Sequence, residues 1–189
     1  MNILLHACCG PCSVYPITVL QKQGHQLTGY FYNPNIHPFR EFKRRMASMR
    51  LCSAEKGMDT EYVTEYGLID YLRKVVFHEE GRCGICYLMR LEEVARKTKE
   101  LGLQGFTSTL LYSRYQKHEL ICSIAEKMAA KYGVAFVYED FREGWQWGID
   151  QAIEMDLYRQ PYCGCIYSEQ ERYDKKYATA MENLRNAKE

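Results

Sequence analysis

The chain has 189 residues, a formal net charge of +1 and an apolar fraction of 47%. This length suits one domain with a substantial core, and no apolar run approaches the ~20 residues that a membrane span needs. The amino terminus lacks the basic and apolar segments of a signal peptide, so we expect a cytoplasmic protein with no membrane partner. The near-neutral charge does not by itself indicate nucleic-acid binding, although local basic patches are compatible with it.

Cysteine and tyrosine are both unusually frequent, with nine and sixteen residues. In a reducing compartment, clustered cysteines more often bind metal or act in catalysis than form structural disulfides. An odd number also argues against complete internal pairing. The tyrosines can pack in the core or offer faces on which nucleic-acid bases stack.

Apolar strand-like segments alternate with helical segments along most of the chain. The predicted strands cover residues 3–6, 26–32, 61–64, 105–109 and 134–138. The predicted helices after them cover residues 13–23, 38–55, 68–77, 81–101 and 116–132. This alternation predicts an α/β fold with a parallel sheet of about five strands, right-handed crossovers and flanking helices.

The alternation ends near residue 140, and two more helices are predicted over residues 148–157 and 168–186. We interpret this part as a helical carboxyl-terminal extension that completes the active site. No linker or repeat interrupts the chain, so residues 1–189 are expected to form a single domain.

The first predicted strand leads directly into His6-Ala7-Cys8-Cys9-Gly10-Pro11-Cys12-Ser13. In an open α/β sheet, ligands bind just beyond the carboxyl ends of the strands, usually where glycines and backbone N–H groups meet a phosphate. This loop offers three thiols instead. Because a helix amino terminus lowers the pKa of a nearby thiol, the loop suits metal binding or redox chemistry.

Two further cysteine clusters are Cys83-Gly84-Ile85-Cys86, which opens a predicted helix, and Cys163-Gly164-Cys165. With Cys8 and Cys9, the middle pair makes four thiolates, which suit either a [4Fe–4S] cluster or a structural zinc ion. The adjacent pair Cys8-Cys9 is awkward for zinc. Ligand counting therefore favours iron–sulfur but leaves zinc open.

Cys163 and Cys165 are separated by one residue, so a disulfide between them would close a tight, strained ring. Strained disulfides are labile and often catalytic, which indicates a redox-active pair; the alternative is two more metal ligands. Cys12 is either a further ligand or a thiol at the start of a helix. We interpret Cys52 and Cys122 as packing residues.

The predicted helix over residues 38–55 is rich in basic residues: Arg40, Lys43, Arg44, Arg45 and Arg50. Such a run usually marks a solvated helix face and can also contact phosphates. His6, at the end of the first strand, can face the site or be a hydrogen-bonded core residue.

Five motifs stand out at residues 6–12, 81–87, 107–112, 141–145 and 162–168. In this order they resemble the motifs of the epoxyqueuosine reductase QueH family, across nearly the whole chain. The resemblance implies reduction of the epoxide of epoxyqueuosine in the tRNA anticodon loop to the alkene of queuosine, with two electrons, two protons and loss of water, and without cobalamin. It also implies a Rossmann-like fold of the nucleotide α-hydrolase type.

The resemblance assigns a [4Fe–4S] cluster to Cys8, Cys9, Cys83 and Cys86. It makes Cys163 and Cys165 a redox-active pair or the ligands of a second, mononuclear iron. By motif position, the candidates for the proton donor are Asp140, Arg142 and Tyr112. The implied partners are tRNA carrying epoxyqueuosine and an external one-electron reductant.

Three other function classes remain open from the residues. One is a zinc-stabilised RNA-binding module without redox activity, and another is a thiol–disulfide oxidoreductase that acts on proteins. The third is a thiolation enzyme of the ATP-pyrophosphatase type. The cysteine loop stands where those enzymes carry Ser-Gly-Gly-x-Asp-Ser, so the missing phosphate-binding sequence counts against this class and against ATP use.

Overall fold

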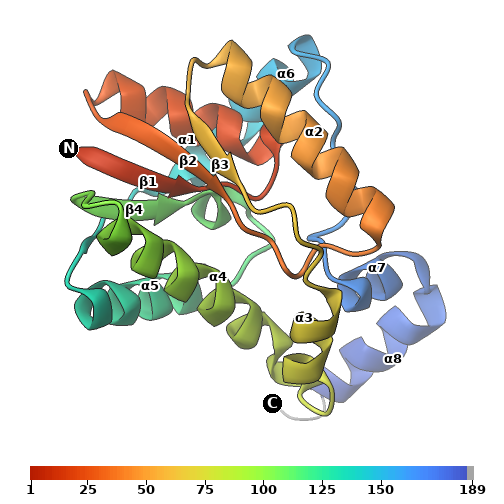
Figure 1. The fold of residues 1–189 in the computed structure, drawn as a ribbon. Coiled ribbons are helices and arrows are strands. Elements are labelled where there is room, and N and C mark those ends of the chain that lie inside the picture. The colour runs from red at the N-terminus through yellow and green to blue at the C-terminus, as the bar shows by residue number, and fades with distance from the viewer. Residues whose placement is uncertain (187–189) are drawn as a thin grey trace.

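The computed structural model describes residues 1–186. Its centre is a parallel five-stranded sheet in the order β3-β2-β1-β4-β5, between two layers of helices (Figure 1). The strands are β1 (Asn2–His6), β2 (Gln26–Phe31), β3 (Thr60–Tyr62), β4 (Gly105–Ser108) and β5 (Ala135–Phe136). The predicted α/β class, the parallel sheet and its number of strands are confirmed.

Helices cover both faces of the sheet (Figure 1). One face carries α1 (Gly10–Lys22), α2 (Phe39–Glu55) and α6 (Trp145–Glu154), and the other carries α4 (Arg82–Glu100) and α5 (His118–Tyr132). Beyond the carboxyl ends of the strands lie α3 (Leu68–Val75), α7 (Ile166–Tyr173) and α8 (Lys175–Asn186). None of the helices in the described part is long and apolar enough to cross a membrane.

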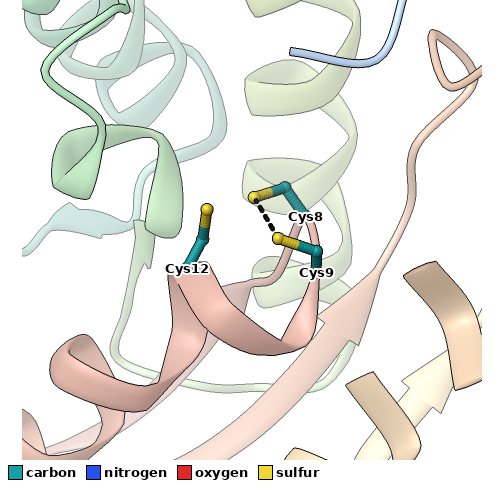
Figure 2. Close-up of side chains that lie close together, drawn as sticks. All are labelled: Cys8, Cys9 and Cys12. Atoms are coloured by element: carbon teal, nitrogen blue, oxygen red, sulfur yellow. Dashed lines mark hydrogen bonds between the residues drawn. The ribbon is translucent and has the colours of Figure 1, made fainter. Parts of the chain in front are cut away.

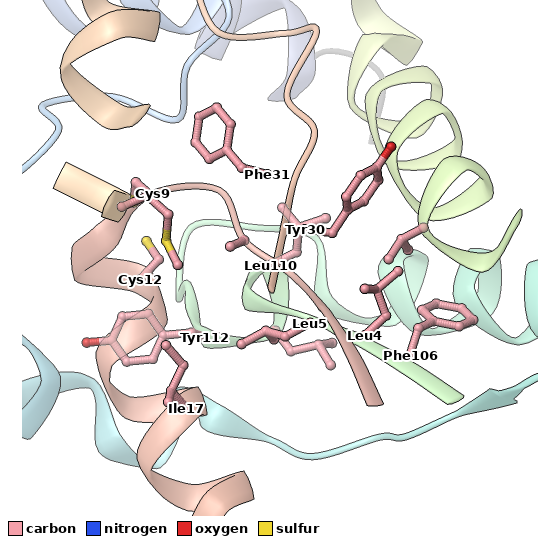
Figure 3. Packing of buried hydrophobic residues seen from close by; sticks show 14 of the residues in the cluster. Leu4, Leu5, Cys9, Cys12, Ile17, Tyr30, Phe31, Phe106, Leu110 and Tyr112 are labelled. Carbon is pink, nitrogen blue, oxygen red and sulfur yellow. The ribbon is translucent and has the colours of Figure 1, made fainter. Parts of the chain in front are cut away.

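The central strands are buried on both faces, as expected for a parallel sheet between helices. Leu4 and Leu5 of β1 and Phe106 of β4 are completely buried. Each such side chain stabilises the fold by roughly 1.5–3 kcal/mol. Figure 3 shows that this core extends to Cys9 and Cys12, so the first cysteine cluster rests on the main hydrophobic core.

The direction in which the chain adds strands reverses between β1 and β4. From β1 the chain proceeds outward to β2 and β3, then returns to β4 and β5 on the other side. Ligands in open α/β sheets bind at such a switch point. His6 pairs in register with Ser108, so the loops after β1 and β4 begin side by side.

Three predicted helices differ from those in the structure. α1 begins at Gly10 rather than Ser13, so Cys12 lies in its first turn; Pro11 fits there because the first turn leaves its N–H groups unpaired. α6 begins at Trp145, because the 3-10 turn η3 (Phe141–Gly144) runs directly into it.

The third difference concerns the last predicted helix, which is two helices, α7 and α8, separated by Asp174. The carboxylate of Asp174 accepts a hydrogen bond from the backbone N–H of Tyr177 at 3.0 Å. An aspartate in this role caps the start of a new helix. Residues 187–189 of the predicted domain lie outside the described residues.

Candidate metal centre and active site

Cys8, Cys9 and Cys12 bring three sulfur atoms together at the carboxyl end of β1 (Figure 2). The three atoms lie within 4.8 Å of one another, and Cys8 Sγ is 3.7 Å from Cys9 Sγ. Cys9 and Cys12 are buried and Cys8 is half-buried. Thiols this close can share one soft metal ion.

Neighbouring groups hold the turn that carries these thiols. Thr109, which follows β4, accepts a hydrogen bond from Cys8 N at 3.0 Å and donates one to Cys8 Sγ at 3.2 Å. Gly10 has no room for a side chain, since a Cβ would lie 2.5 Å from the carbonyl oxygen of Ser48 on α2. The close approach of α1 and α2 therefore requires glycine and fixes the turn.

The three thiols differ in their ionisation. Hydrogen bonds from the Cys12 and Cys9 thiols, with help from Arg90 and Thr109, hold the pKa of Cys8 well below its usual value. Burial raises the pKa of Cys9, and the hydrogen bond to Cys8 raises that of Cys12. Negative charge therefore collects on Cys8, in the thiolate form that binds metal.

A second group of four cysteines lines one hollow: Cys83 and Cys86 of α4, with Cys163 and Cys165 of the carboxyl-terminal segment. The two cysteines of α4 are three residues apart, which places them on one helix face. The middle and late cysteine clusters of the sequence thus converge in space.

The two cysteines before α7, Cys163 and Cys165, differ in the pKa of their thiols and in exposure. The Cys163 thiol and then the Ser168 hydroxyl and amide lower the pKa of Cys165 to about 5. The same contact with Cys165 raises the pKa of Cys163. Cys165 is buried and Cys163 is exposed. One thiolate beside one thiol is the arrangement that thiol–disulfide exchange uses.

Arg90 of α4 lies between the two groups of cysteines. Its Nη1 is 3.8 Å from Cys86 Sγ; burial raises the pKa of Cys86 and the charge of Arg90 opposes that rise, whereas at Cys8 the same charge helps to lower the pKa. Its Nη2 donates a hydrogen bond to Asn33 Oδ1 at 2.9 Å, and its Nε donates one to His6 Nε2 at 3.3 Å. One guanidinium therefore contacts the second cysteine cluster and acts electrostatically on the first.

His6 is both a core residue and a neighbour of the site. Its Nδ1 is 2.8 Å from Ser108 Oγ, and its Nε2 is 3.3 Å from Arg90 Nε and 3.1 Å from the carbonyl oxygen of Tyr32. Burial and the charge of Arg90 lower the pKa of His6 to about 3. The ring is therefore neutral at physiological pH.

Arg45 does not belong to the basic surface of α2, where the sequence placed it. It is 1% exposed, and its Nε forms an ion pair with Glu41 at 2.6 Å. Its Nη1 and Nη2 donate hydrogen bonds to the carbonyls of Cys163 at 3.0 Å and Tyr162 at 2.9 Å. The buried guanidinium ties the late cysteines to α2. The basic residues of α2 that are exposed are Arg40, Lys43, Arg44 and Arg50.

Comparison with known proteins shows to which family the chain belongs. A profile of the family described as epoxyqueuosine reductase QueH matches residues 3–171. Over 180 residues the chain is 41% identical to the epoxyqueuosine reductase QueH of Dehalococcoides mccartyi, covering 95% of this chain and 98% of that one. The chain belongs to the epoxyqueuosine reductase QueH family. It is therefore an oxidoreductase that converts epoxyqueuosine to queuosine in tRNA.

Two more relatives agree with this assignment. The epoxyqueuosine reductase QueH of Thermotoga maritima is 31% identical over 183 residues, with 92% of this chain and 93% of that one covered. The relative from Streptococcus pyogenes is 34% identical over 179 residues, with 88% and 70% covered.

A solved structure shares the fold. A protein of Methanocaldococcus jannaschii, described as a predicted subunit of tRNA methyltransferase, superposes with a TM-score of 0.56 and 15% identity over 82% of this chain and 76% of that one. This likeness confirms the expected Rossmann-like architecture.

The three residues proposed as proton donors in this reductase lie in different surroundings. Tyr112 is buried close enough to Cys12 and Cys9 for their charge to raise its pKa further than burial alone does, and its hydroxyl donates to Trp145 O at 2.9 Å. Asp140 and Arg142 form a partly exposed ion pair at 2.6 Å.

The ion pair with Arg142 changes the ionisation of the Asp140 carboxyl group. Hydrogen bonds from Arg142 lower the pKa of Asp140 to about 2. An ionised carboxylate has no proton to donate at neutral pH, so the geometry favours Tyr112 over Asp140 as a donor.

The interpretation of the remaining cysteines holds for Cys52, which is completely buried, whereas Cys122 is half-buried at the edge of the core. Sequence reasoning missed Asn33 and Arg90. Arg90 had a signal, because it stands seven residues after Cys83 and four after Cys86 on one helix face. Asn33 had none beyond its place after a predicted strand.

The residues around the four-cysteine hollow fit a bound iron–sulfur group, although of the four cysteines that the resemblance assigns to a cluster only Cys83 and Cys86 line this hollow, and Cys8 and Cys9 do not. Asn35 Oδ1 and Arg82 Nε line it, and both are buried with no hydrogen-bond partner among the described residues. Buried polar atoms are nearly always paired, so a bound group that supplies the missing contacts accounts for them. Thiolates are the ligands that iron–sulfur clusters take.

Proposed function

We propose that Cys8, Cys9, Cys83 and Cys86 hold a [4Fe–4S] cluster, with Cys12 as a further candidate ligand. The observation that supports this proposal is that Cys8 and Cys9 in one group, and Cys83 and Cys86 in the other, both lie within electrostatic range of one buried guanidinium, that of Arg90. When bound, the cluster supplies electrons one at a time. An external one-electron reductant replenishes them, and no cobalamin is needed.

Cys163 and Cys165 are proposed as a redox-active pair. Oxidation of the two thiols to a disulfide releases two electrons and two protons. Conversion of an epoxide to an alkene consumes two electrons and two protons and releases one water, so the two half-reactions balance. The unequal pKa values of the pair favour this role over the alternative, in which both sulfurs are ligands of a second, mononuclear iron.

The carboxyl-terminal segment from about residue 140 is proposed to complete the active site, because it brings Cys163 and Cys165 to the hollow lined by α4. Within the site, Tyr112 is the proposed proton donor to the departing oxygen. Its raised pKa keeps it protonated at neutral pH, and its neighbours are the thiols of the first cluster. Asp140 and Arg142 are the alternative donors.

The exposed basic residues of α2 are proposed to hold the anticodon arm of the tRNA. Within residues 1–186, no ion pair to a carboxylate involves Lys43, Arg44 or Arg50. α2 also begins beside the late cysteines, since His37 N donates to Gly164 O at 2.8 Å just before the helix. Unpaired cations next to the site suit phosphate contact.

The place of action is proposed to be the cytoplasm, because all nine cysteines are free thiols. Clustered thiols that serve as ligands or as a reducible pair need a reducing compartment.

Anaerobic purification tests the proposed centre. We expect a brown protein that contains iron and sulfide and shows an electron paramagnetic resonance signal after reduction. Substitution Cys83→Ala should remove the iron and the reduction of epoxyqueuosine in tRNA together. A Cys83→Ala protein with full iron and turnover would refute the ligand assignment. A colourless protein with stoichiometric zinc would instead support the zinc-stabilised RNA-binding module.

A further inference from the structure

Arg90 is a buried charge that no carboxylate balances. It is 3% exposed, and none of the ion pairs within residues 1–186 joins it to Asp or Glu. The other buried arginines each have such a partner: Arg45 has Glu41 at 2.6 Å, and Arg82 has Glu171 at 2.7 Å. An isolated buried charge is strongly destabilising, so Arg90 requires an anion of another kind.

The contacts of the guanidinium point to sulfur as that anion. Nε and Nη2 donate to His6 Nε2 and Asn33 Oδ1, which are neutral acceptors and satisfy hydrogen bonds without balancing the charge. Nη1 faces Cys86 Sγ at 3.8 Å. Among the hydrogen-bond contacts of Arg90 within residues 1–186, the thiol of Cys86, a proposed ligand, is thus the group that can carry negative charge.

The guanidinium is also fixed in orientation. Asn33 donates from Nδ2 to Ala7 O at 2.9 Å, which turns its Oδ1 toward Arg90. Ser108 Oγ lies 2.8 Å from Nδ1 of His6, which holds the imidazole ring in place beside Arg90. The carboxyl ends of three adjacent strands, β1, β2 and β4, therefore support one side chain of α4. A charge supported in this way is preorganised and cannot move away when the charge of the site changes.

We propose that Arg90 is the fixed counter-ion of the metal–thiolate centre and raises its reduction potential. This inference rests on the proposed function, since it needs the centre to hold iron. Reduction adds one electron to the centre, with no bond made or broken, so the reduced form carries one more negative charge. A fixed positive charge in a buried site stabilises that form relative to the oxidised one.

Redox titration of the iron-loaded protein, followed by electron paramagnetic resonance, tests the role. The variants are Arg90→Gln, which removes the charge, and Arg90→Lys, which keeps it. Arg96→Gln is the matched control, because Arg96 lies on the exposed side of the same helix. We expect Arg90→Gln to make the centre at least tenfold harder to reduce, about 59 mV lower for a one-electron couple. Arg90→Lys should keep most of the potential, and Arg96→Gln all of it.

Each other outcome is also decisive. Equal potentials in Arg90→Gln and the unsubstituted protein would overturn the inference. Loss of iron from Arg90→Gln but not from Arg90→Lys would support it, because the charge would then be needed to hold the centre at all. Loss of iron from both variants would overturn it, because charge alone would not explain the result. An unsubstituted protein without iron would refute the proposed function first, before any variant is compared.

Discussion

The first and last cysteine clusters reach the same end of the sheet by different means. Cys8, Cys9 and Cys12 connect a central buried strand to a buried helix, so the backbone itself positions them. Cys163 and Cys165 precede α7 in a segment without regular structure, which Arg45 holds by its backbone carbonyls. The first arrangement suits permanent ligands, and the second suits a pair that changes between dithiol and disulfide.

Removing one thiol from each cluster should have the largest effect on iron content and turnover, and should distinguish the two roles. Cys9→Ala should lose the iron and lower turnover by more than about 100-fold, because loss of a ligand exceeds the 10–100-fold effect of losing an outer neighbour. Cys163→Ala should lose comparable activity but keep its iron. Iron content and single-turnover reduction of epoxyqueuosine in tRNA measure both. Cys52→Ala, a buried cysteine outside the site, is the control. Equal iron loss in Cys9→Ala and Cys163→Ala would make both clusters permanent ligands.

Releasing the tether of the late cluster should have the next largest effect. Arg45→Met leaves Glu41 buried without its partner, which is expected to lower the free energy of unfolding by about 3–5 kcal/mol. Alkylation of Cys163 should accelerate, whereas alkylation of Cys9 should not. Denaturant unfolding and mass spectrometry of the alkylated peptides report the two quantities.

A second substitution serves as the control for the tether. In Arg45→Met/Glu41→Gln the remaining charge is gone, so part of the lost stability should return. The alkylation of Cys163 should stay fast, because the carbonyls of residues 162 and 163 still lack their donor. Slow alkylation in both proteins would show that other contacts hold the segment.

This difference between the clusters also explains what could be read from the sequence. The strands were readable because buried parallel strands are short apolar runs, and the loop after β1 was readable because ligands gather at the carboxyl ends of strands. Arg45 was not readable. Its exposed neighbours on α2 are basic, and the carbonyl that it binds belongs to a residue 118 positions away. Long-range contacts of this kind leave no local pattern.

The same limit applies within the site. The spacing of Cys83 and Cys86 is that of two residues on one helix face. No sequence pattern near them indicated that they lie close to Cys163 and Cys165. The helix starts at Gly10 and Trp145 were missed by three residues each, since turns that continue into a helix give no break in the pattern.

Acid should destabilise the fold around the late cluster. His37 is buried against Tyr66 and Tyr71, and its backbone binds Gly164. Burial lowers its pKa from 6.5 to about 4. The unfolded chain therefore takes up a proton between these values that the folded chain does not, so this stability is complete above pH 6.5 and is lost as the pH falls toward 4.

The expected loss between pH 7 and pH 5 is about 1–2 kcal/mol of unfolding free energy. His37→Phe keeps the ring packing but cannot take up a proton, so its stability should fall less over the same range. Denaturant unfolding of both proteins at the two pH values measures the difference. If they lose the same stability, other groups cause the acid sensitivity and His37 does not.

The smallest effect is expected at the exposed basic residues of α2, where we propose that the tRNA binds. Lys43 and Arg50 are exposed on α2 and, within residues 1–186, form no ion pair. Replacing both by Gln should weaken tRNA binding by roughly 3–10-fold and make the dependence of affinity on salt shallower by about one to two ions, because each lost phosphate contact releases about 0.7–0.9 fewer counter-ions.

Turnover of bound tRNA should stay unchanged in this double variant, because neither residue contacts a cysteine cluster. Fluorescence anisotropy at several salt concentrations gives the affinity and its salt dependence, and Lys99→Gln, an exposed cation of α4, is the control. Since binding to phosphate does not depend on the redox state of the cysteines, the effect should be equal with the late pair reduced or oxidised. An unchanged salt dependence would place the tRNA on another face of the protein. The tRNA would then reach the two clusters without contacting the basic residues of α2.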